Sequence, residues 1–226
     1  RLIKQYHETV SAIEKKYEEK QKKLKVKEKM VAEALATSTL EIPPCEPILG
    51  SPKAFFYRNK MEFSFGRDRD GVVQLGMHVR GRFNWIFDIV ECHLQSSISN
   101  LIVESVRRVA QQLHISAYDL KQHEGILRFL VVRDGKRTGE VMVNLVVASY
   151  PDQKVDQLVD QVLSEITEID VFLVTLHTGK AQVAVGEREY MIKGKGHIAE
   201  QCAGLKFDIS PQSFFQTNPL QAERLY

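Results

Sequence analysis

The sequence predicts an α+β fold, in which an antiparallel sheet carries helices on one face and a long N-terminal helix precedes the sheet. Three observations support this fold class. Residues 2–36 contain neither Gly nor Pro and consist mostly of good helix formers. From Tyr57 onward, short segments alternate apolar and polar residues with the period of two that is typical of half-buried strands. Two longer segments with apolar residues at every third or fourth position interrupt the strands and predict the covering helices.

The first segment, residues 1–36, is a predicted basic helix. Its apolar residues form a narrow stripe, so the helix covers another surface with one side only. It holds ten Lys or Arg and six Glu, which gives a net charge of +4. Such a lysine run is either a solvated helix face or a surface that attracts a polyanion. Residues 37–56 carry four of the seven prolines and predict an extended connector.

The predicted central domain, residues 57–208, begins with a strand in which Met61, Phe63 and Phe65 alternate with polar residues. A turn at 68–71 leads into the second strand. The further predicted elements are strands at 72–79, 86–89, 126–133, 140–148, 171–177, 181–185 and 206–209, and helices at 98–113 and 155–166. Residues 209–226 form a separate segment, in which Asn218 is the predicted cap of a helix that begins at Pro219.

Composition narrows the class of protein. With 43% hydrophobic and 27% charged residues, the chain matches an ordinary globular protein. It has no run of 18 or more apolar residues, so we expect no membrane span. Three scattered cysteines, Cys45, Cys92 and Cys202, do not suit a disulfide framework and favour a cytoplasmic location. The sequence also lacks a CxxC pair, a P-loop and a GxGxxG motif.

Tyr57, Arg58, Asn59 and Lys60 form the first candidate binding segment. Arg58 and Lys60 are two positions apart, so both side chains lie on the same face of the predicted strand. Paired cations beside an aromatic ring and an amide suit RNA phosphates and an unstacked base. The alternative is an exposed strand face whose cations discourage edge-to-edge pairing.

His78 and Arg80, at the end of a predicted strand, form the second candidate segment. Their side chains suit phosphate contacts, and the segment is equally consistent with a plain turn. Cys92 and His93 follow, but adjacent ligands without a second pair do not form a zinc site. A lone Cys is more often a small buried apolar residue.

The third candidate segment is the loop at residues 210–219, which contains Phe214, Phe215 and Gln216. Two rings and an amide suit a flat heterocycle that is held by stacking and hydrogen bonds. The alternative is a loop that caps the next helix and directs its Phe rings into the core.

In their order and spacing, these segments resemble the RNA uracil-5-methyltransferase family, which modifies ribosomal and transfer RNA. The matching residues are 57–63, 76–80, 88–95 and 209–226, together with a lysine-containing helix at 24–35. The most specific match is the sequence SFFQTNP at 213–219. The resemblance covers the chain from about residue 20 to its end.

The resemblance implies S-adenosylmethionine as the cofactor and RNA as the partner. In this family a cysteine thiolate adds to C6 of uracil, and C5 then takes the methyl group of the cofactor. The target base must first leave its stack. By resemblance Gln216 contacts the cofactor, and Phe214 and Phe215 shape its pocket. The expected RNA contacts are Tyr57, Arg58, Asn59, Lys60, His78 and Arg80.

Some features of the family are absent from the sequence. Its glycine-rich cofactor motif and nucleophilic cysteine are expected beyond Tyr226, so we expect no catalytic residue in this chain and take residues 209–226 as the start of a truncated, Rossmann-like methyltransferase domain. Cys92 matches the fourth ligand of the iron–sulfur members. The three clustered upstream cysteines are missing, so we expect no iron–sulfur cluster or other metal in this chain, and a cluster only as an option for the parent protein.

We therefore expect part of a monomeric enzyme that methylates C5 of uridine in structured RNA, above all 23S ribosomal RNA. This part supplies RNA recognition and the edge of the cofactor pocket, and it is inactive by itself. Two alternatives remain. One is an RNA-binding module without catalytic function, and the other is an assembly protein that pairs through its lysine-rich helix.

Overall fold

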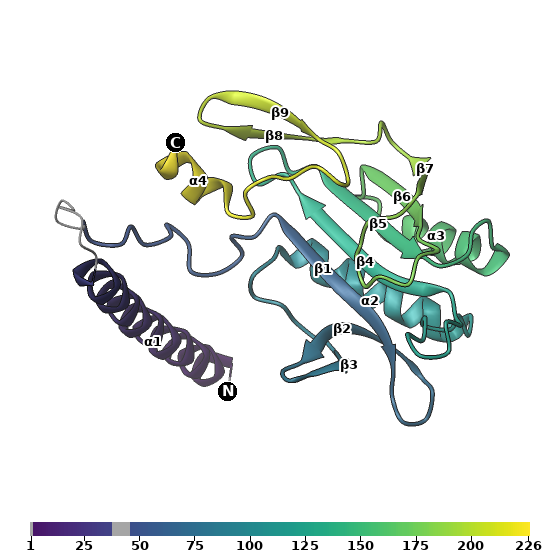
Figure 1. The fold of residues 1–226 in the computed structure, drawn as a ribbon, viewed down its shortest axis with the longest axis horizontal. Helices are drawn as coiled ribbons and strands as arrows, with labels where there is room; N and C mark the ends of the chain where they lie inside the picture. The colour runs from purple at the N-terminus through teal and green to yellow at the C-terminus, as the bar shows by residue number, and fades with distance from the viewer. Residues whose placement is uncertain (1, 38–45) are drawn as a thin grey trace. The chain divides into compact units, whose positions relative to one another are not determined.

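A computed structural model describes residues 2–37 and 46–226 (Figure 1). The chain forms two compact units, Arg1–Ala54 and Phe55–Tyr226. Among the described residues, no helix combines the length and the apolar character that a membrane crossing requires.

The first unit contains helix α1, Leu2–Ala36. Its last turns are mostly exposed, and Lys29 pairs with Glu33 one turn further on, at 3.6 Å. Of the predicted connector, residues 46–54 have no regular secondary structure. Residues 38–45, which include Cys45, lie outside the described residues.

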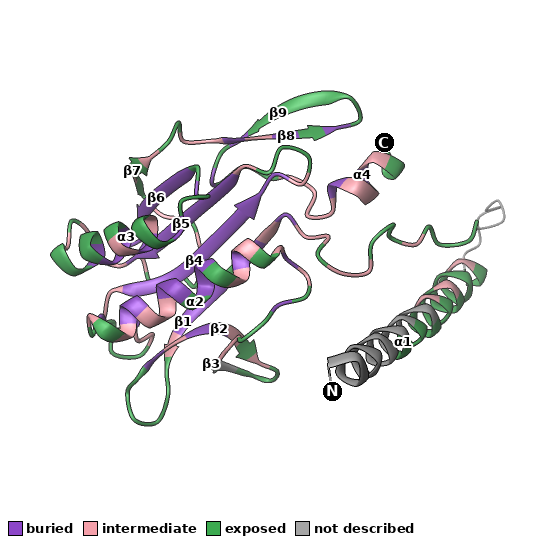
Figure 2. Ribbon diagram, turned by 180° about the vertical axis from the view of Figure 1, so that it is seen from behind, coloured by how far each residue is buried: buried purple, intermediate pink, exposed green. Residues whose placement is uncertain are grey.

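The second unit is built on a seven-stranded sheet with the strand order β3-β2-β1-β4-β5-β6-β7. The strands are β1 (Lys60–Arg67), β2 (Val73–Val79), β3 (Arg82–Asp88), β4 (Leu127–Asp134), β5 (Val141–Val147), β6 (Val171–Leu176) and β7 (Arg188–Lys193). Helices α2 (Ser97–Gln112) and α3 (Gln153–Glu165) lie on one face of the sheet, as predicted (Figures 1 and 2). The hairpin of β8 (Ile198–Cys202) and β9 (Leu205–Ile209) and the short helix α4 (Pro219–Leu225) complete the unit.

The sheet is mixed, so the prediction of an antiparallel sheet is wrong at one pair of strands. β5 and β6 run parallel, with Met142 opposite Val171, whereas the other neighbouring strands are antiparallel. Helix α3 connects these two strands and carries the chain back to the edge where β5 began. β6 therefore runs in the same direction as β5.

The strand predicted at 181–185 is also displaced, because β6 pairs with β7, Arg188–Lys193, instead. The buried side chain of Arg128, in β4, accounts for the difference. Its guanidinium donates hydrogen bonds of 2.6 to 2.9 Å to three carbonyls of the loop at 177–181. A side chain, rather than a neighbouring strand, thus satisfies these carbonyls.

Two apolar clusters hold the sheet from its two faces. Phe63 is fully buried among α2 and α3 together with Met61, and burying such a side chain stabilises a fold by roughly 1.5–3 kcal/mol. On the other face, Met142 and Leu173 pack against Ile198 of the β8–β9 hairpin. β4 lies in the middle of the sheet and is buried along its whole length (Figure 2).

A charge-assisted contact joins α2 to the end of α3. The carboxylate of Glu165 accepts hydrogen bonds from the hydroxyl of Ser105, at 2.6 Å, and from the guanidinium of Arg108. These bonds, of which the one from Ser105 has the largest effect, lower the pKa of Glu165 from 4.5 to about 2.

We expect Glu165→Gln to lower the melting temperature near neutral pH and to weaken its acid dependence. The folded-state pKa lies below the unfolded one, so the carboxylate stabilises the fold above pH 4.5, and this stabilisation is lost as the pH falls toward about 2. Thermal unfolding over this pH range checks the effect, with the exposed Glu168→Gln as the control for losing a charge. If the difference in melting temperature between wild type and Glu165→Gln is the same at every pH, the lowered pKa of Glu165 is contradicted.

Candidate functional site

The start of β1 brings two of the predicted segments together. The backbone amide of Asn59 donates to the carbonyl of Thr217 at 2.9 Å, and its side-chain amide donates to the carbonyl of Gln216 at 3.0 Å. Asn59 in turn accepts a hydrogen bond from the amide of Asp134 at the end of β4, at 3.0 Å. The first candidate segment therefore contacts the loop at 210–218, which we call the SFFQ loop.

Arg133 holds the same loop from β4. It lies opposite Lys60 in the β1–β4 pairing, and its Nη2 donates to the carbonyl of Ser213. The side chain is 4% exposed, and this burial lowers the pKa of its guanidinium, against the raising effect of Glu62. The buried Nε of Arg133 and Oδ1 of Asn59 have no hydrogen-bond partner within the part of the chain that the structure describes.

Asn59 has a loop contact that the sequence did not predict. The residue is 4% exposed, and its side-chain nitrogen donates to the SFFQ loop. The partner carbonyl, on Gln216, is 157 positions away in the sequence, so no local pattern indicates this contact. The predicted RNA contact of Asn59 stays a prediction.

Tyr57, Arg58 and Lys60 are half-buried beside the loop. The backbone of Arg58 donates to the carbonyl of Leu94 at 2.8 Å, and its Nε donates to the carbonyl of Lys60 at 3.2 Å. The Nζ of Lys60 lies 2.5 Å from a carboxylate oxygen of Glu62. The two cations therefore lie close together, and one of them is partly neutralised.

The two Phe rings of the SFFQ loop differ in exposure. Phe214 is 85% exposed, whereas Phe215 packs edge-on against Phe207 at 5.5 Å and joins the second apolar cluster. Gln216 is half-buried, and its side chain makes no hydrogen bond to the described residues. Asn218 caps α4 by accepting from the amide of Gln221 at 3.2 Å, as predicted. The loop thus presents one ring and one amide and anchors itself with the other ring.

His78 and Arg80 lie at and just beyond the end of β2, which runs antiparallel to β1 and pairs Gly76 with Ser64, so the chain leads back toward the end of the sheet where β1 begins. Both are exposed, and the Nε2 of His78 lies 3.0 Å from the hydroxyl of Ser64 in β1. Ser64 is four residue steps from Lys60, which corresponds to about 13 Å along β1. His78 is therefore tied to the middle of β1, and the predicted RNA contacts of His78 and Arg80 stay predictions.

The two described cysteines, Cys92 and Cys202, are both buried. Cys92 is buried in the main apolar cluster, where its backbone exchanges hydrogen bonds with the side chain of Asn100 at 2.9 and 3.2 Å. Burial raises the pKa of the Cys202 thiol, with Glu223 as a further cause, which disfavours the thiolate form. In residues 2–37 and 46–226, His, Cys, Asp and Glu side chains form no group of three or more that suits a metal ion.

Sequence reasoning missed Arg128 and Arg133, which hold the loops at 177–181 and 210–218. A usable signal was present, since both arginines lie in an otherwise apolar stretch predicted as a strand. A buried charge needs hydrogen-bond partners, so such residues indicate that another segment lies over the strand. The sequence does not reveal which segment this is.

Comparison with known proteins finds relatives that match most of this chain. The chain is 35% identical to an uncharacterized RNA methyltransferase of Chlorobaculum tepidum, over 90% of this chain and 45% of that protein. It is 34% identical to one of Caldanaerobacter subterraneus, over 90% of this chain and 46% of that protein. This chain is homologous to RNA methyltransferases. It spans about half the length of these curated relatives.

A solved structure supports the same relationship. The crystal structure of the tRNA (uracil-54, C5)-methyltransferase of Pyrococcus abyssi, in complex with S-adenosyl-L-homocysteine, matches with a TM-score of 0.61 and 31% identity. The match covers 77% of this chain and 41% of that one. No protein-family model matches the chain. The similarity in sequence and in structure confirms the predicted resemblance to RNA uracil-5-methyltransferases.

We expect Asn59→Ala to loosen the SFFQ loop. The change leaves the carbonyl of Gln216 without its donor, which destabilises the fold. It also removes the unpaired Oδ1 of Asn59, which offsets part of this loss, so we expect the free energy of unfolding to fall by only about 1 kcal/mol. Hydrogen exchange of the backbone amides at 213–218 should become faster. Gln122→Ala, which removes an exposed amide elsewhere, is the control. Unchanged exchange at 213–218 would show that Asn59 does not hold the loop.

Proposed function

We propose that this chain is the RNA-recognition part of an S-adenosylmethionine-dependent methyltransferase that acts on C5 of uridine in structured RNA, with 23S ribosomal RNA as the expected substrate. One observation carries the proposal. In a chain homologous to RNA methyltransferases, the SFFQ loop is held by Asn59 and Arg133 and exposes Phe214. The proposal includes a monomeric protein in the cytoplasm, where ribosomal and transfer RNAs are modified.

The SFFQ loop fits the edge of a cofactor pocket. Phe214 offers an exposed ring to a flat heterocycle such as adenine, and the side-chain amide of Gln216 offers a donor and an acceptor. Phe215, which is packed against Phe207, fits as the anchor that fixes the loop. S-adenosylmethionine, when bound, supplies the methyl group. Gln216 and Phe214 would hold and orient it.

The RNA contacts belong beside this loop. Arg58 and Lys60 place two cations next to Tyr57 at the start of β1. Cations suit phosphate oxygens, and an aromatic ring suits a base that has left its stack. Because these cations lie beside the SFFQ loop, an RNA strand bound to them would lie close to the cofactor.

Recognition and positioning, rather than nucleophilic attack, are the roles that the described residues suit. Cys92 and Cys202 are both buried, and the pKa of the Cys202 thiol is raised, so neither is suited to attack uracil as a thiolate. We therefore assign the nucleophile to neither of them. The described residues supply substrate binding and one side of the cofactor pocket.

We expect Arg58→Glu/Lys60→Glu to weaken the binding of an RNA stem-loop. The loss of two phosphate contacts should make the plot of log affinity against log salt concentration less steep, by roughly one to two units of slope. Fluorescence anisotropy of a labelled, uridine-rich stem-loop over a salt series measures this slope. The matched control is Lys22→Glu/Lys23→Glu, which reverses two exposed charges on α1.

The two variants separate the alternatives. If only the α1 variant changes the slope, the basic helix attracts the RNA and the assignment of Arg58 and Lys60 is wrong. If wild type binds no RNA, the proposed RNA-recognition role fails. If RNA binds but S-adenosylmethionine does not slow hydrogen exchange in the SFFQ loop, the results favour an RNA-binding module without a cofactor.

We expect S-adenosylmethionine to slow hydrogen exchange in the SFFQ loop. Contact with Phe214 and Gln216 would shield the amides at 213–218 and restrict their opening. Mass spectrometry of exchange with and without S-adenosylmethionine measures the effect, and Gln216→Ala should reduce it. The control is Gln212→Ala, which removes an exposed side-chain amide that lies in the same loop, outside residues 213–218, and donates to Glu189. Equal exchange with and without the cofactor would contradict the pocket assignment.

A further inference from the structure

A cavity lies at the far end of β1 from the SFFQ loop. It has a volume of about 540 Å³ and lies between the hairpin strands β1–β3 and the loop at 117–121. We call it the β1–β3 groove. Its lining includes Arg67, Gln74, His78, Trp85, Tyr118 and Lys121. Its volume lies within the range of roughly 300–1,000 Å³ that is usual for small-molecule sites.

The groove opens on the sheet face that α2 and α3 leave uncovered. Met61, Phe63 and Phe65 face the helices, so the intervening positions of β1 face the other side. Gly66 is one of these positions, and Gln74 lies opposite it. Arg133, which holds the SFFQ loop, lies opposite Lys60 and also on this face. The SFFQ loop and the groove therefore share one face of the sheet.

The floor of the groove depends on a glycine. A Cβ on Gly66 would lie 2.6 Å from Cγ1 of Ile86, which is closer than two non-bonded carbon atoms approach in proteins. Without that Cβ, Ile86 packs across β1 and is 7% exposed. The neighbouring Trp85, in contrast, is 48% exposed and lines the groove.

The opposite wall is fixed before any ligand arrives. The carboxylate of Asp119 accepts from the amides of Lys121 and Gln122 at 2.8 and 3.0 Å, which closes the loop at 117–121. The guanidinium of Arg128 lies over the ring of Tyr118, at 4.1 Å from its centroid. Because these bonds order the wall in advance, a ligand loses little free energy in ordering it.

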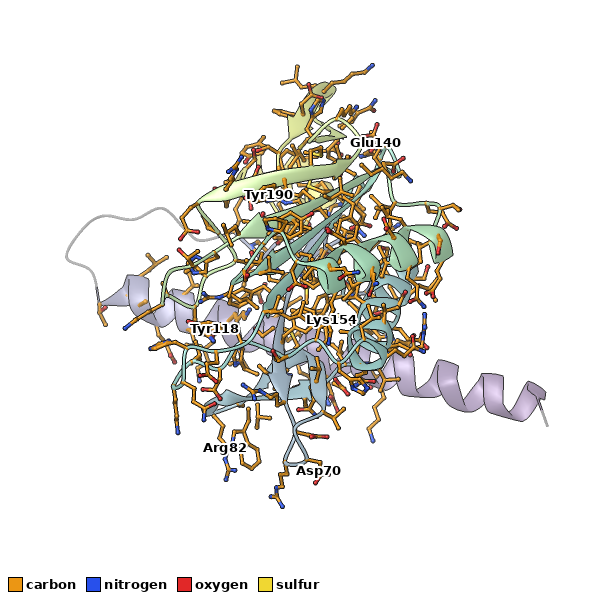
Figure 3. The ribbon with its side chains drawn as sticks, turned by 90° about the vertical axis from the view of Figure 1, so that its right-hand side faces the viewer. Asp70, Arg82, Tyr118, Glu140, Lys154 and Tyr190 are labelled. Carbon is orange, nitrogen blue, oxygen red and sulfur yellow. The ribbon has the colours of Figure 1, made fainter. Side chains whose placement is uncertain are left out.

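Two guanidinium groups lie near the exposed Trp85 ring. The guanidinium of Arg82 lies 4.6 Å from the ring centroid, and that of Arg69 lies 5.9 Å away. Lys121 lines the same groove from the loop at 117–121. Figure 3 shows Arg82 and Tyr118 on the same side of the unit, with Asp70 at the tip of the nearby hairpin.

Two carboxylates also line the groove, and both are engaged. Asp68 accepts from the amides of Asp70 and Val72 at 2.9 and 2.8 Å. Asp119 pairs with Arg67 at 3.6 Å, in addition to its two backbone bonds. Within the described residues, neither carboxylate forms an ion pair with Arg69 or Arg82. The backbone hydrogen bonds from Gln122 and Lys121 lower the pKa of Asp119, and the charge of Lys121 contributes to this lowering.

We propose that the β1–β3 groove binds an unpaired nucleotide of RNA, with its base stacked on Trp85 and its phosphate held by Arg69, Arg82 and Lys121. The proposal rests on the proposed RNA-binding function and adds a second contact, about 23 Å along β1 from Lys60. Single-stranded nucleic acid is recognised in this way, by stacking on aromatic rings next to cations that follow the backbone. An RNA duplex has no free base face to offer.

Trp85 itself reports on the groove, because it is the only tryptophan of the chain. We expect a single-stranded oligouridine of about twelve nucleotides, within the usual site size for such strands, to quench its fluorescence in a saturable way. A duplex of the same length should quench it much less. Anisotropy of the labelled oligonucleotide, measured in parallel, reports binding anywhere on the chain.

Variants then separate stacking from structure. Trp85→Ala should weaken oligouridine binding roughly 5- to 150-fold, whereas Trp85→Phe, which keeps a ring, should retain most of the affinity. The double variant Arg69→Glu/Lys121→Glu keeps Trp85 but loses the proposed phosphate contacts. Oligouridine should therefore no longer quench the fluorescence of Trp85 in this variant. The control is Lys154→Glu, on α3 and hence on the helix-covered side, which should change neither signal (Figure 3). Melting temperatures confirm that each variant is folded.

The outcomes distinguish this inference from the function on which it rests. RNA that raises the anisotropy but leaves Trp85 emission unchanged would overturn the groove assignment and leave the proposed function standing. Equal affinity of Trp85→Ala and wild type would overturn it as well. Quenching by the duplex as strong as by the single strand would show that the groove reads a duplex backbone, against the proposal. If no RNA binds at all, both fail.

Discussion

Arg128 and Arg133 lie near the two ends of β4, a strand whose eight residues are all buried. Each arginine is 4% exposed, and burial lowers the pKa of both guanidinium groups because it strips water from the charge. A guanidinium in such a position is strongly destabilising unless hydrogen bonds replace the lost water. Both groups donate to backbone carbonyls, Arg128 to the loop at 177–181 and Arg133 to the SFFQ loop. The position of each loop is therefore tied to the central strand.

This constraint explains why the two proposed binding surfaces lie on one face of the sheet. The helices α2 and α3 cover the other face and close it with apolar side chains. On the uncovered face, irregular segments lie over the strands, and irregular backbone needs hydrogen bonds from the residues beneath it. Side chains on these segments, such as Phe214, can remain exposed because their backbone is held. A stiff sheet thus presents ring and amide groups at defined positions.

The sequence predicted most of the regular elements because the alternation in β1 and the helical periodicity of α2 and α3 are local signals. It did not predict the parallel pairing of β5 with β6, because the direction of a strand depends on where the connecting helix packs. Asn59 shows the same limit for the site. Its residue type suited an RNA contact, but its burial follows from a loop far along the chain. The sequence did indicate the SFFQ loop, because two Phe rings and several polar side chains occur together within ten residues.

The hydrogen bond between Asn59 and Gln216 joins residues that are 157 positions apart. Contacts of such long sequence separation form late in folding, since the intervening chain must be ordered before they become favourable. The segments between them make up nearly the whole second unit, from β1 to β9. A chain that has folded only in part, such as one still leaving the ribosome, therefore has strands and helices but no assembled SFFQ loop. The ligand contacts proposed for this loop therefore depend on the whole folded unit and not on the local sequence of the loop alone.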